Sequence, residues 1–157
     1  ACGFLPLSFS KVQSRMVGPK LIKDYCKEKF GIDIKTVGEV VRVINESLAF
    51  KYKCALEEIE ECTGKKYNSI YMIGGGVQSQ MLCQMTANAC NCTVYAGPIE
   101  ATVLGNISIQ LITNGKIKNI KEARKIIKNS EIIKVYKPQD IEEWNKNYIR
   151  FKSLINK

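Results

Sequence analysis

The part of this sequence best suited to chemistry is a run of glycines between a strand-like segment and a helix-like one. Ser69–Ile73 is largely apolar and leads into Gly74-Gly75-Gly76, after which Gln78–Gln80 forms the polar opening of a helix. Glycine tolerates positive φ and lets a ligand approach closely, so such a turn can bring backbone N–H groups to a nucleotide phosphate. We therefore take this turn as the candidate binding site.

Two common phosphate-binding motifs are absent around the turn. The P-loop pattern G-x-x-x-x-G-K-[ST] does not occur, and the dinucleotide pattern G-x-G-x-x-G fails because its last glycine would fall at Ser79. The identity of the ligand must therefore come from the surrounding segments.

The neighbouring segments predict a βαβ unit. Met81, Leu82, Met85 and Ala89 recur at helical spacing, and Thr93–Ala96 is a second strand-like segment. A strand, a glycine turn, a helix and another strand predict a parallel pair of strands. We interpret the methionines as packing residues, which is their usual role at helical spacing.

The rest of the chain is mostly helical by pattern. We expect helices over 19–30, 36–64, 98–114, 120–129 and 140–155, and a strand over 131–136. Thr36 with Glu39 forms a capping box for the long helix, and Gly64 ends it. We expect its apolar stripe to consist of Val37, Val40, Val41, Ile44, Leu48, Tyr52, Leu56 and Ile59. Its solvent-exposed face should carry Glu57, Glu58, Glu60 and Glu61.

Two of these helices carry further expectations. The helix over 98–114 is apolar on most sides, which predicts a buried helix, with Gly105 allowing close backbone packing. In the last helix Trp144 lies in phase with the apolar edge and should anchor the C-terminal segment to the core.

The composition suits a single globular domain. The chain has 157 residues, is 45% hydrophobic, carries a net charge of +9 and has no histidine, and none of its apolar runs is long enough to span a bilayer. Most lysines alternate with apolar positions of the expected helices, without interleaved aromatic residues, so we interpret them as solvated faces and expect no nucleic-acid partner. A basic nucleic-acid-binding module remains an alternative, which a steep salt dependence of DNA binding would support.

The seven cysteines lie within helix-like and strand-like segments and follow no secretory signal. We therefore expect free thiols in a reducing cytoplasm rather than disulfides. Cys83, Cys90 and Cys92 lack the paired spacing and the histidines of a zinc site, so no metal site is expected.

The pattern of the first residues is not typical of the natural N-terminus of a protein. The chain starts without methionine, and 1–10 is apolar with no basic region ahead of it, which is unlike a signal peptide. We expect 1–18 to be an arm and 19–157 to be one domain of a longer protein.

At this point the residues show a resemblance to a known family. The segment Gly74–Ser79 and the segment from Ala96 to Asn106 resemble the C-terminal signature of the FGGY carbohydrate kinases. The helix before them is also similar to this family, and the likeness covers about 19–151 with its segments in the family's order.

The resemblance implies an α/β fold of the actin-like ATPase (ribonuclease H-like) class, with helices on a mixed sheet and without its N-terminal strands. It also implies ATP as phosphoryl donor, Mg²⁺ bridging the phosphates and a ketose as acceptor. L-rhamnulose is the ketose of the nearest subfamily, and xylulose and fuculose stay open because the sugar pocket would lie outside this chain. In-line phosphoryl transfer depends mainly on positioning and charge neutralisation.

For individual residues the resemblance reaches only the nucleotide side. Gly75 matches the family glycine whose backbone contacts ATP, and Gly74 and Gly76 shape the turn. Gln78 and Ser79 match the adenine-side polar residues, although Ser79 replaces the more usual asparagine and has a shorter reach. No catalytic residue is carried over, because the family's base is an aspartate that precedes this region, so the chain alone should be inactive.

Two expectations follow from the resemblance beyond the turn. Glu100, Thr102 and Asn106 match the second signature, where helix capping and domain packing explain them better than ligand contact. The missing N-terminal strands would leave the strand at Ser69–Ile73 with an open edge, so the chain should self-associate through this edge or through 1–10.

Overall fold

The computed structural model describes residues 18–155. Its elements in chain order are α1 Pro19–Phe30, α2 Val37–Thr63, β1 Ser69–Met72, the 3₁₀ turn η2 Gly75–Gln78, α3 Gln80–Cys90, β2 Thr93–Ala96, α4 Ala101–Thr113, α5 Ile120–Ser130, β3 Lys134–Tyr136 and α6 Ile141–Ile155. Each expected helix and strand is present close to its expected bounds. The expected arm 1–18 lies, apart from Gly18, outside the described residues.

The strands form one mixed sheet in the order β1-β2-β3. β1 and β2 are parallel, with Ser69 opposite Thr93, and β2 and β3 are antiparallel, with Val94 opposite Tyr136. The parallel pair with α3 between its strands confirms the expected βαβ unit.

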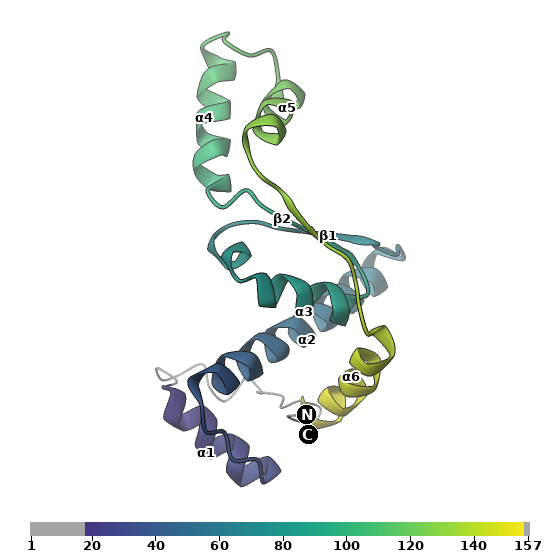
Figure 1. The fold of residues 1–157 in the computed structure, drawn as a ribbon. Helices are drawn as coiled ribbons and strands as arrows, with labels where there is room; N and C mark the ends of the chain where they lie inside the picture. The colour runs from purple at the N-terminus through teal and green to yellow at the C-terminus, as the bar shows by residue number, and fades with distance from the viewer. Residues whose placement is uncertain (1–17, 156–157) are drawn as a thin grey trace.

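Two helices, α3 and α2, form successive layers on one face of this small sheet. In Figure 1 the sheet lies in the middle of the molecule, with α3 against one face and α2 beyond α3. The α4–α5 hairpin extends at one end of the molecule, and α1 and α6 lie at the other. A buried cluster joins η2 and α3 to the inner face of the sheet through Val77, Cys83, Ala87, Val94 and Ala96.

The ends of α2 follow from its sequence. The Thr36 hydroxyl accepts a hydrogen bond from the Glu39 N–H at 3.2 Å, and the Glu39 carboxylate accepts one from the Thr36 N–H at 2.8 Å. At the other end Gly64 has φ +65°, a left-handed conformation that glycine adopts without strain. The expected capping box and stop are both confirmed.

The buried face of α2 differs from the expected stripe. Val37, Val41, Tyr52 and Ile59 are exposed. Val40 is buried as expected, and the other buried residues, which lie outside the expected stripe, are Val43, Asn45, Glu46, Ser47, Ala49 and Phe50. Several of these are small or polar, so a pattern of apolar residues alone points to the wrong part of the helix surface.

The polar groups on this buried face have partners. The Ser47 hydroxyl donates to the Val43 carbonyl at 2.7 Å, and Asn45 donates to the Met81 sulfur of α3 at 3.5 Å. Arg42 Nε donates to Glu46 Oε1 at 2.6 Å. Burial raises the pKa of Glu46, and the Arg42 guanidinium offsets part of this shift. A pairing of this kind is what makes a buried charge tolerable.

The last helix docks on α2 through aromatic side chains. The rings of Trp144, Tyr148 and Phe151 lie 5.4, 5.7 and 5.2 Å from the ring of Phe50, measured between centroids. Trp144 and Phe151 are buried, so the expected anchoring role of Trp144 is confirmed.

A polar cluster extends this contact. It also shows that the face of α2 expected to be solvent-exposed is only partly so. The Tyr148 hydroxyl and Lys152 Nζ each donate to Glu57 Oε2 at 2.7 Å. Glu60 accepts from Lys66 and from the Tyr67 N–H, so it is also engaged. Of the four expected solvent-facing carboxylates, only Glu58 and Glu61 are exposed, because α6 and the segment leading into β1 pack beside the other two.

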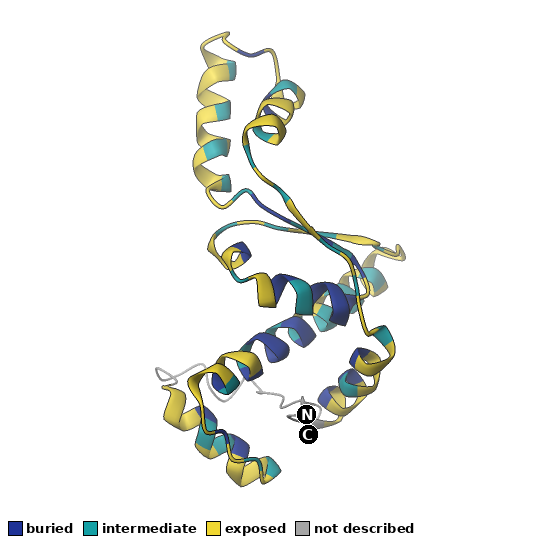
Figure 2. Cartoon of the chain, in the orientation of Figure 1, coloured by how far each residue is buried: buried dark blue, intermediate teal, exposed yellow. Residues whose placement is uncertain are grey.

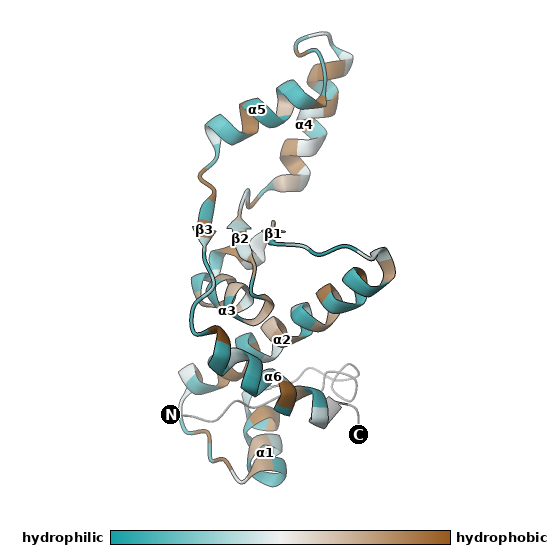
Figure 3. Ribbon diagram, turned by 90° about the vertical axis from the view of Figure 1, so that its right-hand side faces the viewer, coloured by the Kyte–Doolittle hydropathy of each residue, from teal (hydrophilic) through white to brown (hydrophobic). Residues whose placement is uncertain are grey.

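The helix expected to be buried is an exposed one. α4 has no buried residue, and Figure 2 shows it mainly in the colour of exposed residues. Figure 3 shows many apolar residues along it, and α5 packs against one side. A Cβ at Gly105 would meet no atom within 4 Å, so the expected close packing there is also wrong for the described residues. An apolar composition indicates that a helix requires a partner to bury its surface, but it does not show that this partner is present.

None of the described helices is long and apolar enough to cross a membrane.

The described cysteines are free thiols, as expected. Cys26, Cys83, Cys90 and Cys92 are buried, where they act as small core residues. Burial raises the pKa of Cys90 to about 12, so its thiol stays protonated. Within 18–155 no group of three or more His, Cys, Asp or Glu could hold a metal ion.

We expect acid to weaken the docking of α6 on α2, because the ionised carboxylate of Glu57 contributes to this docking. Desolvation raises the pKa of Glu57, but hydrogen bonds from Lys152 and Tyr148 outweigh it and leave the pKa below the ordinary value of 4.5. A carboxyl with a lowered folded-state pKa adds stability above its unfolded pKa, and this stability is lost as the pH falls through the folded pKa. In urea unfolding, Glu57→Gln should be less stable than wild type at neutral pH, and the difference should shrink as the pH falls below about 4.5.

Glu58→Gln is the matched control, because Glu58 is a neighbouring carboxylate that is exposed. Its free energy of unfolding should follow that of wild type at each pH. Equal effects of the two substitutions would contradict the role assigned to Glu57.

Candidate functional site

The parallel strands β1 and β2 end side by side, and a glycine-containing loop follows each. The Gly97 N–H donates to the Met72 carbonyl at 2.9 Å, and the Gly74 N–H donates to the Pro98 carbonyl at 3.2 Å. These bonds continue the pairing past the strand ends and fix one loop against the other. In α/β sheets, ligands bind at this carboxyl edge.

The glycine turn has two kinds of glycine. Gly74 has φ +83° and ψ −171°, a region that is essentially restricted to glycine. The Val77 N–H then donates to the Gly74 carbonyl at 3.2 Å, which closes the 3₁₀ turn. A Cβ at Gly75 or Gly76 would meet no atom within 4 Å. The backbone therefore requires Gly74, whereas Gly75 and Gly76 leave the surface of the turn clear for another molecule.

Gln78 and Ser79 have different surroundings. The Ser79 hydroxyl accepts a hydrogen bond from the Leu82 N–H at 3.2 Å and so caps α3. Because this oxygen already accepts a hydrogen bond from the helix backbone, it has less hydrogen-bonding capacity left for a ligand. Gln78 instead lines a hollow next to the turn.

This hollow has a volume of about 720 Å³ and lies at the carboxyl edge of β1 and β2. Its lining residues are Val77, Gln78, Ala96, Gly97, Ile99, Ser130, Glu131, Ile132 and Lys134. The lining combines apolar side chains with a few polar ones, as small-molecule sites do, and its volume is typical of such sites.

The segment from α5 to β3 is the part of the site that the sequence did not identify. Because β3 runs antiparallel to β2, its first residue, Lys134, lies opposite Ala96 at the carboxyl end of β2. The approach is close, since a Cβ at Gly97 would lie 3.1 Å from the Ile132 carbonyl oxygen. Gly97 also has φ +130°. Both its backbone conformation and the lack of space for a Cβ therefore favour glycine at this position. A lysine at the start of a strand that follows a βαβ unit was the available signal.

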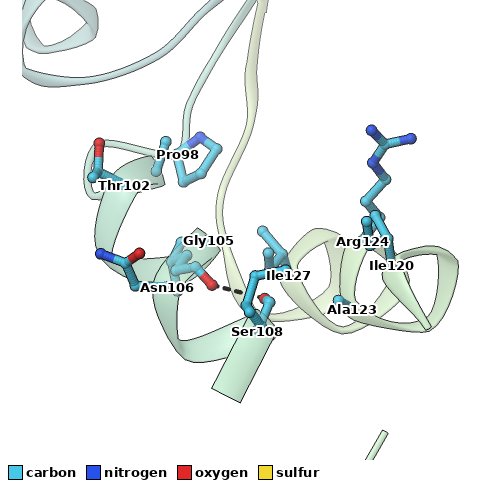
Figure 4. A pocket seen from close by; sticks show the side chains of 12 residues that line it. Pro98, Thr102, Gly105, Asn106, Ser108, Ile120, Ala123, Arg124 and Ile127 are labelled. Carbon is cyan, nitrogen blue, oxygen red and sulfur yellow. Dashed lines mark hydrogen bonds between the residues drawn. The ribbon is translucent and has the colours of Figure 1, made fainter. Parts of the chain in front are cut away.

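Other residues of the second signature lie elsewhere. Thr102 and Asn106 line another hollow, of about 430 Å³, between α4 and α5 (Figure 4). In Figure 4 Pro98, Gly105 and Ser108 lie on the α4 side of this hollow, and α5 supplies mainly apolar side chains such as Ile127.

Glu100 occupies the N-cap position of α4, but its side chain makes no capping hydrogen bond, so the expected cap is wrong. The structure thus brings Gln78 together with Gly97 and Ile99, and separates them from Thr102 and Asn106.

Comparison with known proteins agrees with the two signatures. A sequence model of the FGGY family of carbohydrate kinases, C-terminal domain, matches residues 7–113. A rhamnulokinase of Bacteroides thetaiotaomicron is 37% identical over 134 residues, which cover 85% of this chain and 28% of the relative. A rhamnulokinase of Bacillus subtilis is 42% identical over 123 residues, or 78% of this chain and 25% of the relative. One from Halalkalibacterium halodurans is 41% identical over the same share of this chain and 26% of its own length. The chain spans about a quarter of the length of these curated relatives.

The two kinds of glycine predict different responses to alanine. Gly74→Ala places a Cβ in a glycine-only conformation and should lower the free energy of unfolding by about 1–3 kcal/mol. Gly75→Ala meets open space without a left-handed φ, so its stability should stay within about 1 kcal/mol of wild type. Urea unfolding of both variants measures this. Similar losses in both would contradict the structure of the turn.

Proposed function

Because the chain belongs to the FGGY family of carbohydrate kinases, as a C-terminal domain, we propose that it forms the ATP side of a rhamnulokinase. The whole protein would transfer a phosphoryl group from ATP to L-rhamnulose, giving L-rhamnulose 1-phosphate in the cytoplasm. The observation that carries the proposal is the pair of glycine loops tied together at the carboxyl edge of β1 and β2, with a hollow beside them.

The glycine turn and the hollow beside it offer several groups to a nucleotide, although Gly75 and Gly76 belong to the turn and do not line the hollow. Gly75 and Gly76 leave space where a Cβ would otherwise stand, so their backbone can approach a phosphate closely. Gln78 lines the hollow and can hydrogen-bond an adenine edge, and Lys134 adds a positive charge. Bound ATP would supply the phosphoryl group, and Gly75, Gly76, Gln78 and Lys134 would hold and orient it.

Mg²⁺ finds no set of ligands in the part of the chain that is described. No cluster of three or more candidate ligands occurs there, and Mg²⁺ is commonly held by substrate phosphates and waters with only one or two carboxylates. We propose that the ion is bound through the ATP phosphates, and we assign no residue of this chain to it.

The ketose and the general base belong, in this proposal, to polypeptide outside this chain. Phosphoryl transfer requires a base or positioning group on the attacking hydroxyl. Of the residues lining the hollow, Glu131 carries the only carboxylate. A carboxylate beside ATP phosphates is repelled by them unless a cation lies between, so we do not assign Glu131 as the general base. The chain alone should therefore bind nucleotide without turning it over.

A graft into two kinase scaffolds tests the proposal. This chain replaces the matching C-terminal segment in the Bacillus subtilis rhamnulokinase and, separately, in a xylulokinase. We expect ATP turnover with L-rhamnulose in the first chimera and little with xylulose in the second. Gly75→Val in the active chimera should raise the KM for ATP about tenfold or more, because its side chain fills the approach to the phosphates, and leave the KM for the sugar unchanged.

Ile126→Val is the control variant, since Ile126 is not among the residues that line the hollow, and it should leave both KM values unchanged. Activity in the xylulokinase scaffold alone would move the assignment to another sugar kinase of the family. Two folded but inactive chimeras would overturn the kinase proposal.

A further inference from the structure

Four polar side chains line the hollow at the carboxyl edge of β1 and β2, those of Gln78, Ser130, Glu131 and Lys134. The Ser130 hydroxyl already donates to the Ile126 carbonyl at 2.6 Å, within α5. Among the described residues, the side chains of Gln78, Glu131 and Lys134 have no hydrogen bond or ion pair. Glu131 and Lys134 carry opposite charges and still do not pair with each other. These three side chains are therefore available to a ligand.

The backbone at Glu131 is held on both sides. Its N–H donates to the Ile127 carbonyl at 2.9 Å, which ends α5, and its φ of −110° and ψ of 142° begin an extended segment. The next residue lies close to the loop after β2, since a Cβ at Gly97 would be 3.1 Å from the Ile132 carbonyl oxygen. Glu131 itself is half-buried. Its carboxylate is thus a fixed part of the wall of the hollow.

Glu131 and the glycine turn lie on opposite sides of β2. The strand order is β1-β2-β3, and Figure 3 shows β2 between the other two strands. The glycine turn follows β1, and Glu131 comes shortly before β3. Neighbouring strands lie about 4.8 Å apart, so the two backbones are separated by about 10 Å. A nucleotide whose phosphates reach Gly75 and Gly76 therefore presents its nucleoside part to Glu131.

The chemistry of a carboxylate selects one part of the nucleoside. An ionised carboxylate accepts hydrogen bonds and donates none, so it is repelled by phosphates. The edge of adenine sets a donor beside an acceptor, which the amide of Gln78 can match and a carboxylate cannot. The ribose offers two neighbouring hydroxyl donors, one for each carboxylate oxygen. Hydrogen bonds to a charged acceptor are among the stronger ones.

We propose that Glu131 binds the ribose hydroxyl groups of the nucleotide and makes this site selective for ribonucleotides over 2′-deoxyribonucleotides. The inference rests on the proposed function, because it takes the hollow to hold the nucleoside of ATP. A site that hydrogen-bonds a hydroxyl group rejects the analogue that lacks it, since the polar group of the protein is then left without its partner. Lys134 supplies the positive charge for the phosphates, which Glu131 cannot do.

Titrations of the ¹⁵N-labelled full chain with ADP and with 2′-deoxy-ADP, followed by amide chemical shifts, test the proposal. Wild type should bind ADP more tightly than 2′-deoxy-ADP by about tenfold or more, the loss expected for one hydrogen bond to a charged group. Glu131→Ala should bind the two nucleotides equally. Glu131→Gln keeps one acceptor and nearly the same size, so it should retain part of the selectivity. Comparing both nucleotides on the same variant cancels the general effect of removing a negative charge.

Two controls isolate the ribose contact. Glu142→Ala removes an exposed carboxylate that does not line the hollow, and it should keep the selectivity of wild type. Inosine diphosphate carries a carbonyl in place of the amino group of adenine and so tests the other donor of the nucleoside. The ratio of its affinity to that of ADP should be the same in wild type and Glu131→Ala. A change in this ratio would place Glu131 at the base and overturn the proposal.

The outcomes separate this inference from the proposed function. If ADP and 2′-deoxy-ADP shift the Gly75 and Gly76 amides with equal affinities in wild type, the assignment of Glu131 is overturned and the proposed function stands. Selectivity that survives in Glu131→Ala has the same consequence. If neither nucleotide shifts these amides when in large excess, the proposed function is overturned, and this inference with it.

Discussion

The pairing of β1 with β2 past the ends of the two strands is the contact on which the rest of the structure depends. The bonds from Gly97 to Met72 and from Gly74 to Pro98 hold two loops, separated along the chain by all of α3, at one edge of the sheet. The same pairing fixes which backbone groups of β1 point inward and which point outward. It therefore places the two loops beside the hollow at the carboxyl edge.

Local features were predictable from the sequence because neighbouring residues determine them. The capping box at Thr36, the left-handed stop at Gly64 and the parallel βαβ unit all follow from short patterns. The glycine turn was also predictable, although only the structure separates Gly74, which the backbone requires, from Gly75, which leaves open space.

What the sequence did not predict depends on contacts between distant segments. Lys134 joins the site because β3 lies antiparallel to β2, and periodicity carries no information on strand direction. The face of α2 was misassigned because its close contacts use small and hydrogen-bonded residues such as Ser47. α4 is apolar enough to be buried, yet α5 covers only one side of it in the described residues. Thr102 and Asn106, which resemble the second signature of the family, line the α4–α5 hollow and not the hollow beside the glycine turn.

The proposed function requires nucleotide binding at the tied loops, which a titration of the ¹⁵N-labelled chain with ADP, followed by amide chemical shifts, measures residue by residue. We expect the largest shifts at Gly75, Gly76 and Gly97 and a smaller one at Lys134, while Thr102 in the α4–α5 hollow stays unchanged. Shifts confined to the α4–α5 hollow, or no shifts at the glycines when ADP is in large excess, would contradict it.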